Sequence, residues 1–185
     1  LPVLDPLFQP LRTEVKTFLG GANAKLVYTK FDNGEWKSSG KSIWYIDYSH
    51  ANPSEIKVVQ SGDEVRNPII TPDGQWVMYN TLRNGNAGKC YICPLQANGG
   101  NNRIEIGDGA QPHWWQKPGT NNHYIIWNSH DLEDGWQCNW QSLCSGGRAE
   151  TYIRQVNPSA KQMLSNRATL MNQYGNSGRS KAGGW

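Results

Sequence analysis

A repeat of about 44 residues constrains the fold of this chain more strongly than any other sequence feature. Pro68 is followed 44 positions later by Pro112, and the turn Thr71-Pro72-Asp73-Gly74 has a counterpart in Lys117-Pro118-Gly119. After each turn the chain repeats again, because His123–Asn128 matches Gln75–Asn80. Repeats of this length that hold four short strands are typical of β-propeller blades. A β-sandwich would not repeat the same Asn, Pro and Gly offsets, so we expect an all-β propeller.

The chain divides into an N-terminal stretch and repeating units of short strands and turns. Its 20 Gly, 10 Pro and 9 Trp suit such units. Residues 1–24 are expected to form an extended lead-in and first strand, and prolines at 2, 6 and 10 exclude a helix in the first ten residues. The predicted blades span residues 25–63, 64–109, 110–169 and, as an incomplete copy, 170–185. Strands are expected at 25–31, 42–48, 55–59, 66–70, 75–81, 89–95, 102–106, 123–128, 150–156 and 160–164.

The run RNPIITPDGQWVMY, residues 66–79, resembles the repeat of TolB-like propellers. Blades of that family carry an Asn-Pro pair, a Ser/Thr-Pro-Asp-Gly turn and then an aromatic-rich strand. The resemblance covers residues 25–185, with degenerate copies in the first and third units, and it implies six blades around a channel. It also implies that the second strand packs between blades, which fits Trp76, Tyr79 and Trp127 as core residues.

The number of predicted blades has a physical consequence. About three and a half four-stranded blades cannot close a six-bladed ring, and an open ring would expose apolar blade faces that drive association. We therefore expect a longer native protein, with a second chain that completes the ring as the alternative.

The four cysteines give two separate predictions. Cys90 and Cys93 lie in one predicted strand, where residues three apart point to opposite faces and lie about 10 Å apart. That separation exceeds the reach of a disulfide, so we expect two ordinary thiols, one in each packed face. Cys138 and Cys144 lie in an inserted segment, residues 131–147, and we predict a disulfide that staples it. A zinc site built from all four cysteines is the alternative, although their spacing is wrong for ordinary zinc knuckles.

Candidate ligand-binding residues lie in two kinds of place. Some lie on the short innermost strands, where they could line a channel, although His113 could equally be a hydrogen-bonded structural residue. Others are tryptophans of the inserted segment. An exposed Trp on a rigid scaffold can stack on a sugar or anchor a protein, but these could also cover the edge of their own blade. The predicted set is Arg66, Asn67, His113, Trp114, Trp136 and Trp140.

The sequence carries no catalytic or cofactor motif that we recognise. No two of the four His are at metal-ligand spacing on one element, and neither a Gly-x-Ser-x-Gly elbow nor a phosphate-binding loop occurs. We expect no bound metal and no cofactor, and we favour a non-enzymatic role. The alternative is a propeller-fold polysaccharide lyase or hydrolase whose catalytic residues lie partly outside this sequence.

Charge and composition limit the kinds of partner and the cellular compartment that we expect. The net charge of +3 is spread over single basic residues, which argues against nucleic acid. No apolar stretch approaches the roughly 18 residues of a membrane span. The even number of cysteines suits an oxidising compartment, so we expect a periplasmic or extracellular protein that begins, at Leu1, inside a longer precursor. The expected function is a module that binds a protein or glycan, or a scaffold; a structural component of a surface assembly is a third hypothesis.

Overall fold

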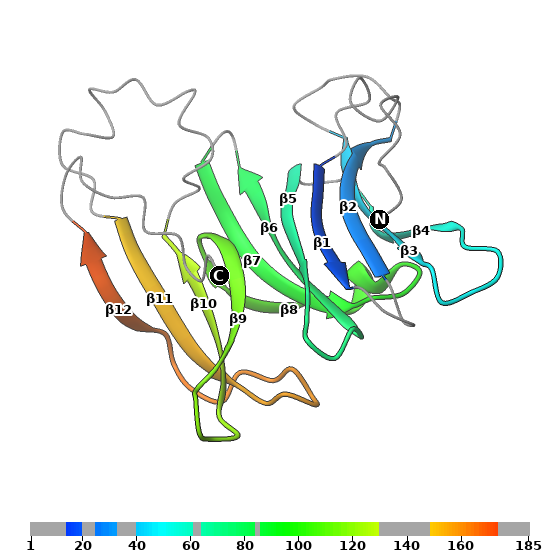
Figure 1. Ribbon diagram of the computed structural model, residues 1–185. Coiled ribbons are helices and arrows are strands. Elements are labelled where there is room, and N and C mark those ends of the chain that lie inside the picture. The colour runs from blue at the N-terminus through cyan, green and yellow to red at the C-terminus, as the bar shows by residue number, and fades with distance from the viewer. Residues whose placement is uncertain are drawn as a thin grey trace. The chain divides into compact units, whose positions relative to one another are not determined.

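The computed structural model describes residues 14–19, 25–32, 40–60, 64–83, 86–129 and 149–173. This part of the chain is all-β, as expected, and contains no α-helix (Figure 1). A short 3-10 helix, η2, spans Gly99–Asn102. The strands are β1 Glu14–Leu19, β2 Lys25–Phe31, β3 Lys41–Asp47, β4 Glu55–Val59, β5 Glu64–Ile70, β6 Trp76–Arg83, β7 Asn86–Pro94, β8 Ile104–Asp108, β9 Ala110–Gln116, β10 His123–Asn128, β11 Ala149–Val156 and β12 Ala168–Gln173.

The strands form three four-stranded sheets, each built from four strands consecutive along the chain. Sheet A contains β1–β4, sheet B contains β5–β8 and sheet C contains β9–β12. The strand pairs whose register is defined are all antiparallel. The chain also separates into two compact units. Unit 1 holds residues 1–78 and 93–103, and unit 2 holds residues 79–92 and 104–185, so sheet B contributes residues to both.

The second strand of each sheet carries the same three-residue burial pattern. It reads Val27-Tyr28-Thr29 in β2, Met78-Tyr79-Asn80 in β6 and Ile126-Trp127-Asn128 in β10. In each triplet an apolar residue, an aromatic residue and a polar residue are all buried. Burying a polar side chain is costly unless it is hydrogen-bonded, so the third position must have partners. Of the expected core residues, Tyr79 and Trp127 are fully buried, whereas Trp76 is half-buried.

The Asn-Pro position of the repeat has an unusual backbone conformation in two copies. Asn67 and Gln111 each precede a proline and adopt φ of 51° and 56°. Positive φ is uncommon for residues other than glycine. Both residues are also buried, with 5% of their surface exposed. In sheet C the register between β9 and β10 shifts between the His113 and Ala110 pairings, which marks a β-bulge around Gln111. Asn67 and Gln111, which lie 44 residues apart, therefore share a backbone conformation as well as a position in the sequence repeat.

The bulge of β9 places Gln111 in a buried polar chain within unit 2. The backbone N–H of Gln111 donates to Asn80 Oδ1 at 3.1 Å. Its side-chain Oε1 accepts from Asn128 Nδ2 at 3.1 Å, and Asn128 Oδ1 accepts from Thr151 Oγ1 at 3.2 Å. All four residues are at most 5% exposed. The chain of hydrogen bonds, here called the polar ladder, thus links β6, β9, β10 and β11.

The Thr71–Gly74 turn, which connects β5 to β6 in sheet B, folds as the sequence predicts. The N–H of Gly74 donates to the carbonyl of Thr71 at 2.8 Å, which closes the expected four-residue turn. Asp73 Oδ1 accepts from the N–H of Gln75 at 3.1 Å, and Thr71 Oγ1 accepts from the N–H of Trp76 at 3.1 Å. The turn is therefore held by its own side chains as well as by its backbone.

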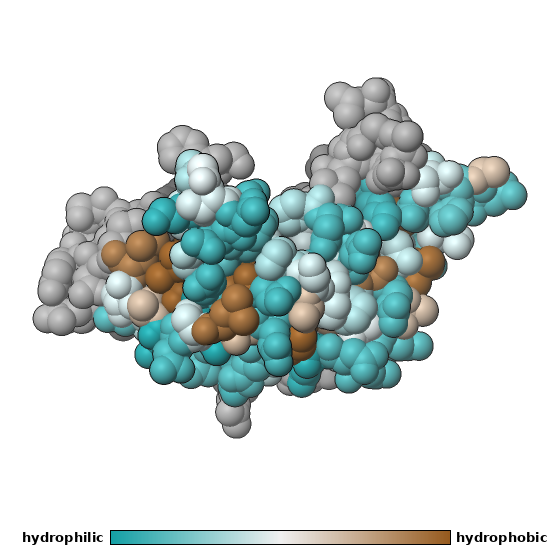
Figure 2. Space-filling view, turned by 90° about the horizontal axis from the view of Figure 1, so that it is seen from below, coloured by the Kyte–Doolittle hydropathy of each residue, from teal (hydrophilic) through white to brown (hydrophobic). Residues whose placement is uncertain are grey.

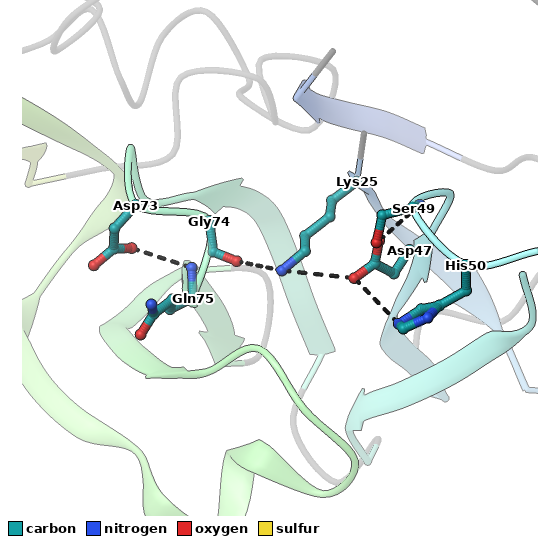
Figure 3. Close-up of polar contacts among 7 residues, drawn as sticks. All are labelled: Lys25, Asp47, Ser49, His50, Asp73, Gly74 and Gln75. Carbon is teal, nitrogen blue, oxygen red and sulfur yellow. Dashed lines mark hydrogen bonds and ion pairs between the residues drawn. The ribbon is translucent and has the colours of Figure 1, made fainter. Parts of the chain in front are cut away.

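Lys25 joins this turn to sheet A within unit 1 (Figure 3). Its Nζ donates to the carbonyl of Gly74 at 2.9 Å and lies 3.8 Å from Asp47 Oδ2. Asp47 is opposite Lys25 across β2 and β3, accepts from the N–H of Ser49 at 3.0 Å and lies 3.8 Å from His50 Nε2. The hydrogen bonds from Ser49 lower the pKa of Asp47 against the opposing effect of burial, with help from the charges of Lys25 and His50.

The last strand of sheet C differs from the prediction. A strand was expected at 160–164, but the strand β12 is Ala168–Gln173, and Met163 makes only an isolated bridge to Val156. Lys161 explains the difference, because it has φ of 56° and its N–H donates to the carbonyl of Asn157 at 2.9 Å, so the chain turns here instead of extending. Residues 98–100 form the start of η2 and its N-terminal flank.

The polar ladder predicts a large effect for a small substitution. Asn128→Ala removes two buried hydrogen bonds of the Asn128 amide, one to Gln111 Oε1 and one from Thr151 Oγ1, which costs about 2–3 kcal/mol. The free energy of unfolding, measured by urea denaturation, should fall by that amount. Asn121→Ala, at an exposed turn position in the same unit, is the control and should change stability by less than about 0.5 kcal/mol. Equal losses for the two variants would contradict a special role for the ladder.

The contacts of Asp47 predict a pH-dependent contribution to stability. Asp47→Ala should lower the free energy of unfolding at pH 7 by about 1 kcal/mol, because two hydrogen bonds to Ser49 are lost. Since the folded pKa lies below the unfolded value of about 3.9, this contribution is complete above about pH 5 and disappears as the pH falls through the lowered pKa.

Denaturation curves of both proteins between pH 7 and pH 2.5 test this. Asp108→Ala, which removes an exposed carboxylate of unit 2, serves as the control. A stability difference between wild type and Asp47→Ala that stays constant over the whole pH range would refute the interpretation.

Candidate functional site

The residues predicted to bind a ligand lie in different parts of the structure. Arg66 and Asn67 are in β5 of unit 1, the first half-buried and the second buried. His113 and Trp114 are in β9 of unit 2, and both are half-buried. Trp136 and Trp140, as well as the predicted disulfide partners Cys138 and Cys144, lie outside the described residues. The described members of the set therefore form two pairs, one in each unit.

An aromatic row on one face of sheet C is the best candidate for a binding site. Trp115 is opposite Tyr124 across β9 and β10, and Tyr124 is opposite Gln155 across β10 and β11. Directly opposed residues of a sheet point to the same face, so these three side chains form a line across three strands. The row Trp115–Tyr124–Gln155 continues into a second row of His113, Ile126 and Ile153 on the same face.

The geometry of the row suits contact with a flat ligand. The rings of Trp115 and Tyr124 have centroids 5.4 Å apart and are inclined by 42°. Trp115 is 38% exposed, which makes it one of four large hydrophobic residues above one-third exposure in the described part of the chain, with Tyr48, Leu164 and Leu170. The amide of Gln155 can both donate and accept hydrogen bonds. The row therefore contains an exposed indole, a partly exposed phenol ring and an amide at its end.

The opposite face of sheet C is packed instead of open. Ile125, Trp127 and Val156 are buried there. Trp127 Nε1 donates to the carbonyl of Asp108 at 2.8 Å, and Arg154 Nη1 donates to the carbonyl of Ile106 at 2.6 Å, so this face lies against β8 within unit 2. Burial, followed by the hydrogen bond to Glu150, raises the pKa of Tyr152 on this face. The row's face is also buried at Ile126 and Asn128, so its exposure is confined to the end of the sheet that carries Trp115.

Trp114 belongs to the edge of the packed face. Its Nε1 donates to His123 Nδ1 at 3.1 Å, and the two rings lie 5.5 Å apart. Lys161, only 1% exposed, places its Nζ 5.3 Å from the centre of the Trp114 indole. Trp114 is therefore engaged by two neighbours, and it is the neighbouring Trp115 that points to the open face.

Sequence reasoning missed Trp115, Tyr124 and Gln155. The available signal was strand parity: in a strand, successive side chains point to opposite faces, so Trp114 and Trp115 cannot share a surface. Trp115 and Tyr124 flank the Lys117–Thr120 turn and would face each other in a hairpin. Gln155 could not be found, because its position opposite Tyr124 depends on strand pairing across the long inserted segment.

The cysteines of β7 match their prediction. Cys90 and Cys93 are both fully buried, and neither forms a disulfide. Burial raises the pKa of the Cys93 thiol to about 12, and the nearby positive charge of Arg103 only partly opposes this. A protonated thiol is a poor nucleophile and metal ligand, so Cys93 is an inert packing residue. Among the described residues, no three His, Cys, Asp or Glu side chains gather in a group that could hold a metal ion.

The surface of the molecule shows where other apolar residues gather. In Figure 2 they form separate patches between hydrophilic residues, and no single patch covers the face in view. Trp and Tyr fall near the middle of this hydropathy scale, so an aromatic surface does not stand out by its colour. No helix in the described part of the chain is long and apolar enough to cross a membrane.

Comparisons with known proteins add no family. No protein-family model matches the sequence, and no curated protein matches it either. The resemblance to TolB-like propellers therefore depends on the repeat alone.

The hydrogen bond between Trp114 and His123 predicts one histidine tautomer. Because Nδ1 accepts the indole N–H, the proton of the neutral ring must lie on Nε2. Nitrogen-15 NMR at pH 8 should therefore show His123 as the Nε2–H form. The Trp114→Phe variant removes the donor, and the two tautomers should then become mixed. A wild-type His123 with its proton on Nδ1 would contradict the hydrogen bond.

Proposed function

We propose that this chain is part of a TolB-like β-propeller that binds glycans outside the cytoplasm. Three features support the propeller. The three sheets are each built from four consecutive strands. Their second strands repeat one buried triplet, and the Asn67 and Gln111 positions repeat one backbone conformation at the 44-residue offset. In this proposal the sheets are blades, and a longer chain or a second chain completes the ring.

The row Trp115–Tyr124–Gln155 is the observation that carries the proposed glycan binding. Pyranose rings present flat C–H faces that stack on aromatic side chains, while their hydroxyl groups need donors and acceptors such as the Gln155 amide. The row lies on strands of a sheet, whose backbone holds the side chains in fixed relative positions. A preorganised aromatic surface binds with little loss of conformational entropy. The proposal assigns no catalytic residue.

The test is a direct binding measurement with defined glycans. Cello-oligosaccharides, chito-oligosaccharides, xylan and mannan are titrated into the protein in isothermal calorimetry. Trp115→Ala should weaken binding of the recognised glycan about tenfold, which corresponds to about 1.4 kcal/mol of lost stacking. Tyr124→Ala should weaken it by a smaller factor, since Tyr124 is less exposed than Trp115.

Two kinds of control separate the alternatives. Tyr48→Ala removes an aromatic ring of unit 1 that is 44% exposed, and it should leave the affinity unchanged. Trp136→Ala and Trp140→Ala test the inserted segment, and a loss confined to these two variants would move the site away from the row. The proposal is wrong if no glycan of the panel binds, or if Trp115→Ala binds as tightly as wild type.

A further inference from the structure

The pair Asn98-Gly99, in the connection between β7 and β8 of unit 1, is a dipeptide that deamidates readily in unfolded chains. In this reaction the backbone nitrogen of the glycine attacks Cγ of the asparagine side chain, ammonia leaves, and a five-membered succinimide ring forms. Water then opens the ring at either of its two carbonyl carbons, which gives aspartate or isoaspartate. Glycine favours the attack because it carries no side chain and its backbone rotates freely.

The backbone of the folded protein opposes the first step of this reaction. The N–H of Gly99 donates to the carbonyl of Gln96 at 3.0 Å, and Gly99 is buried, so the attacking nitrogen is already engaged. Asn98 has φ of 55° and ψ of 26°. With this ψ the Gly99 nitrogen lies on the far side of the Asn98 Cα–C bond from Cβ, whereas ring closure needs the two atoms eclipsed. The side chain can therefore reach the nitrogen only after the local backbone rotates.

Hydrogen bonds to neighbouring segments hold this backbone conformation. The N–H of Asn98 donates to the carbonyl of Lys57 in β4 at 3.0 Å, and the carbonyl of Asn98 accepts from the N–H of Asn101 at 3.0 Å. The rotation that the reaction needs would break these bonds and separate η2 from β4. Local opening of this kind has a free-energy cost, and only the opened fraction of the molecules can react.

The isoaspartate product does not fit the folded connection. Its main chain runs through the former side chain and is one carbon atom longer. A Cβ atom at Gly99 would lie 1.9 Å from the Pro94 carbonyl oxygen, and one at Gly100 would lie 3.2 Å from both methyl carbons of Val59. The segment therefore has no room for an additional main-chain atom. Aspartate keeps the original chain length, and it is among the residues that tolerate positive φ.

We infer that Asn98-Gly99 is a modification site that the native fold protects and that local opening of unit 1 exposes to irreversible deamidation. Reaction at this pair requires the β7–β8 connection to open, and conversion to isoaspartate prevents the connection from closing again. Transient opening is thereby converted into permanent chemical damage. The lifetime of the folded protein then depends on how firmly η2 packs against β4.

The first experiment compares the rate of Asn98 deamidation in folded and unfolded protein. The full chain is incubated at pH 8 with and without guanidinium chloride, and peptide mass spectrometry follows each site. We expect Asn98 to react at least about thirtyfold more slowly in the folded protein. In denaturant, Asn33-Gly34 and Asn84-Gly85 give the intrinsic rate of the same dipeptide, and Asn98 should match them. An Asn98 rate that is equal in folded and unfolded protein would overturn the inference.

Two matched valine variants locate the protecting contact. Val59→Ala removes the methyl groups that pack against Gly100, and it should accelerate deamidation of Asn98 in the folded protein about fivefold. Val156→Ala makes the same change at a buried position of unit 2 and should alter the Asn98 rate less than about twofold. Equal acceleration by the two variants, or an unchanged rate in Val59→Ala, would refute control by local opening.

The second experiment follows the two products through refolding. Wild-type protein is partly deamidated in guanidinium chloride, refolded by dilution and separated by size-exclusion chromatography. Isoaspartate at position 98 should occur only in the fraction that fails to refold, and aspartate at 98 should occur in both fractions. Asn98→Asp should fold like wild type, which shows that the longer main chain and not the new charge is responsible. Isoaspartate at 98 in the folded fraction would contradict the irreversibility.

Discussion

The polar ladder is the interaction on which the arrangement of unit 2 depends. A buried amide normally weakens a core unless each of its groups finds a partner, and the bulge at Gln111 is what supplies the partners here. Because φ is positive at this one residue, its N–H faces Asn80 while its side chain meets Asn128. The hydrogen bonds are directional, so they fix which residues of β9 and β10 lie opposite each other, and apolar packing alone would not.

Trp127 shows how closely the apolar core is fitted around the same strands. A Cβ atom at Gly107 would lie 2.8 Å from the indole, and one at Gly109 would lie 2.2 Å from the Asn128 carbonyl oxygen. Both glycines also have positive φ, 158° and 134°, although the first value is close to extended. The connection between β8 and β9 can therefore pass directly over the Trp127 ring, and the indole N–H reaches the Asp108 carbonyl. Any side chain at Gly109 would separate these elements.

Much of the fold could be predicted because it depends on residues that are close together in the sequence of each repeat. The Thr71–Gly74 turn follows from residue preferences at adjacent positions, and strand geometry predicts that Cys90 and Cys93 form no disulfide with each other. The strand expected at 160–164 was wrong because the left-handed conformation of Lys161 has no local sequence signal; lysine rarely adopts it. The candidate site was harder still to predict, because Gln155 comes to lie opposite Tyr124 only through strand pairing between distant segments.

The surface proposed to bind glycans depends on the packing of the opposite face. In sheet C, burial of Ile125 and Trp127 on one face fixes the strands, and alternation then places Trp115 and Tyr124 on the other face. The residues that set the fold therefore differ from those proposed to meet a ligand. Recognition can change by substitution at Trp115 while the repeat is retained, because one fold can carry many functions.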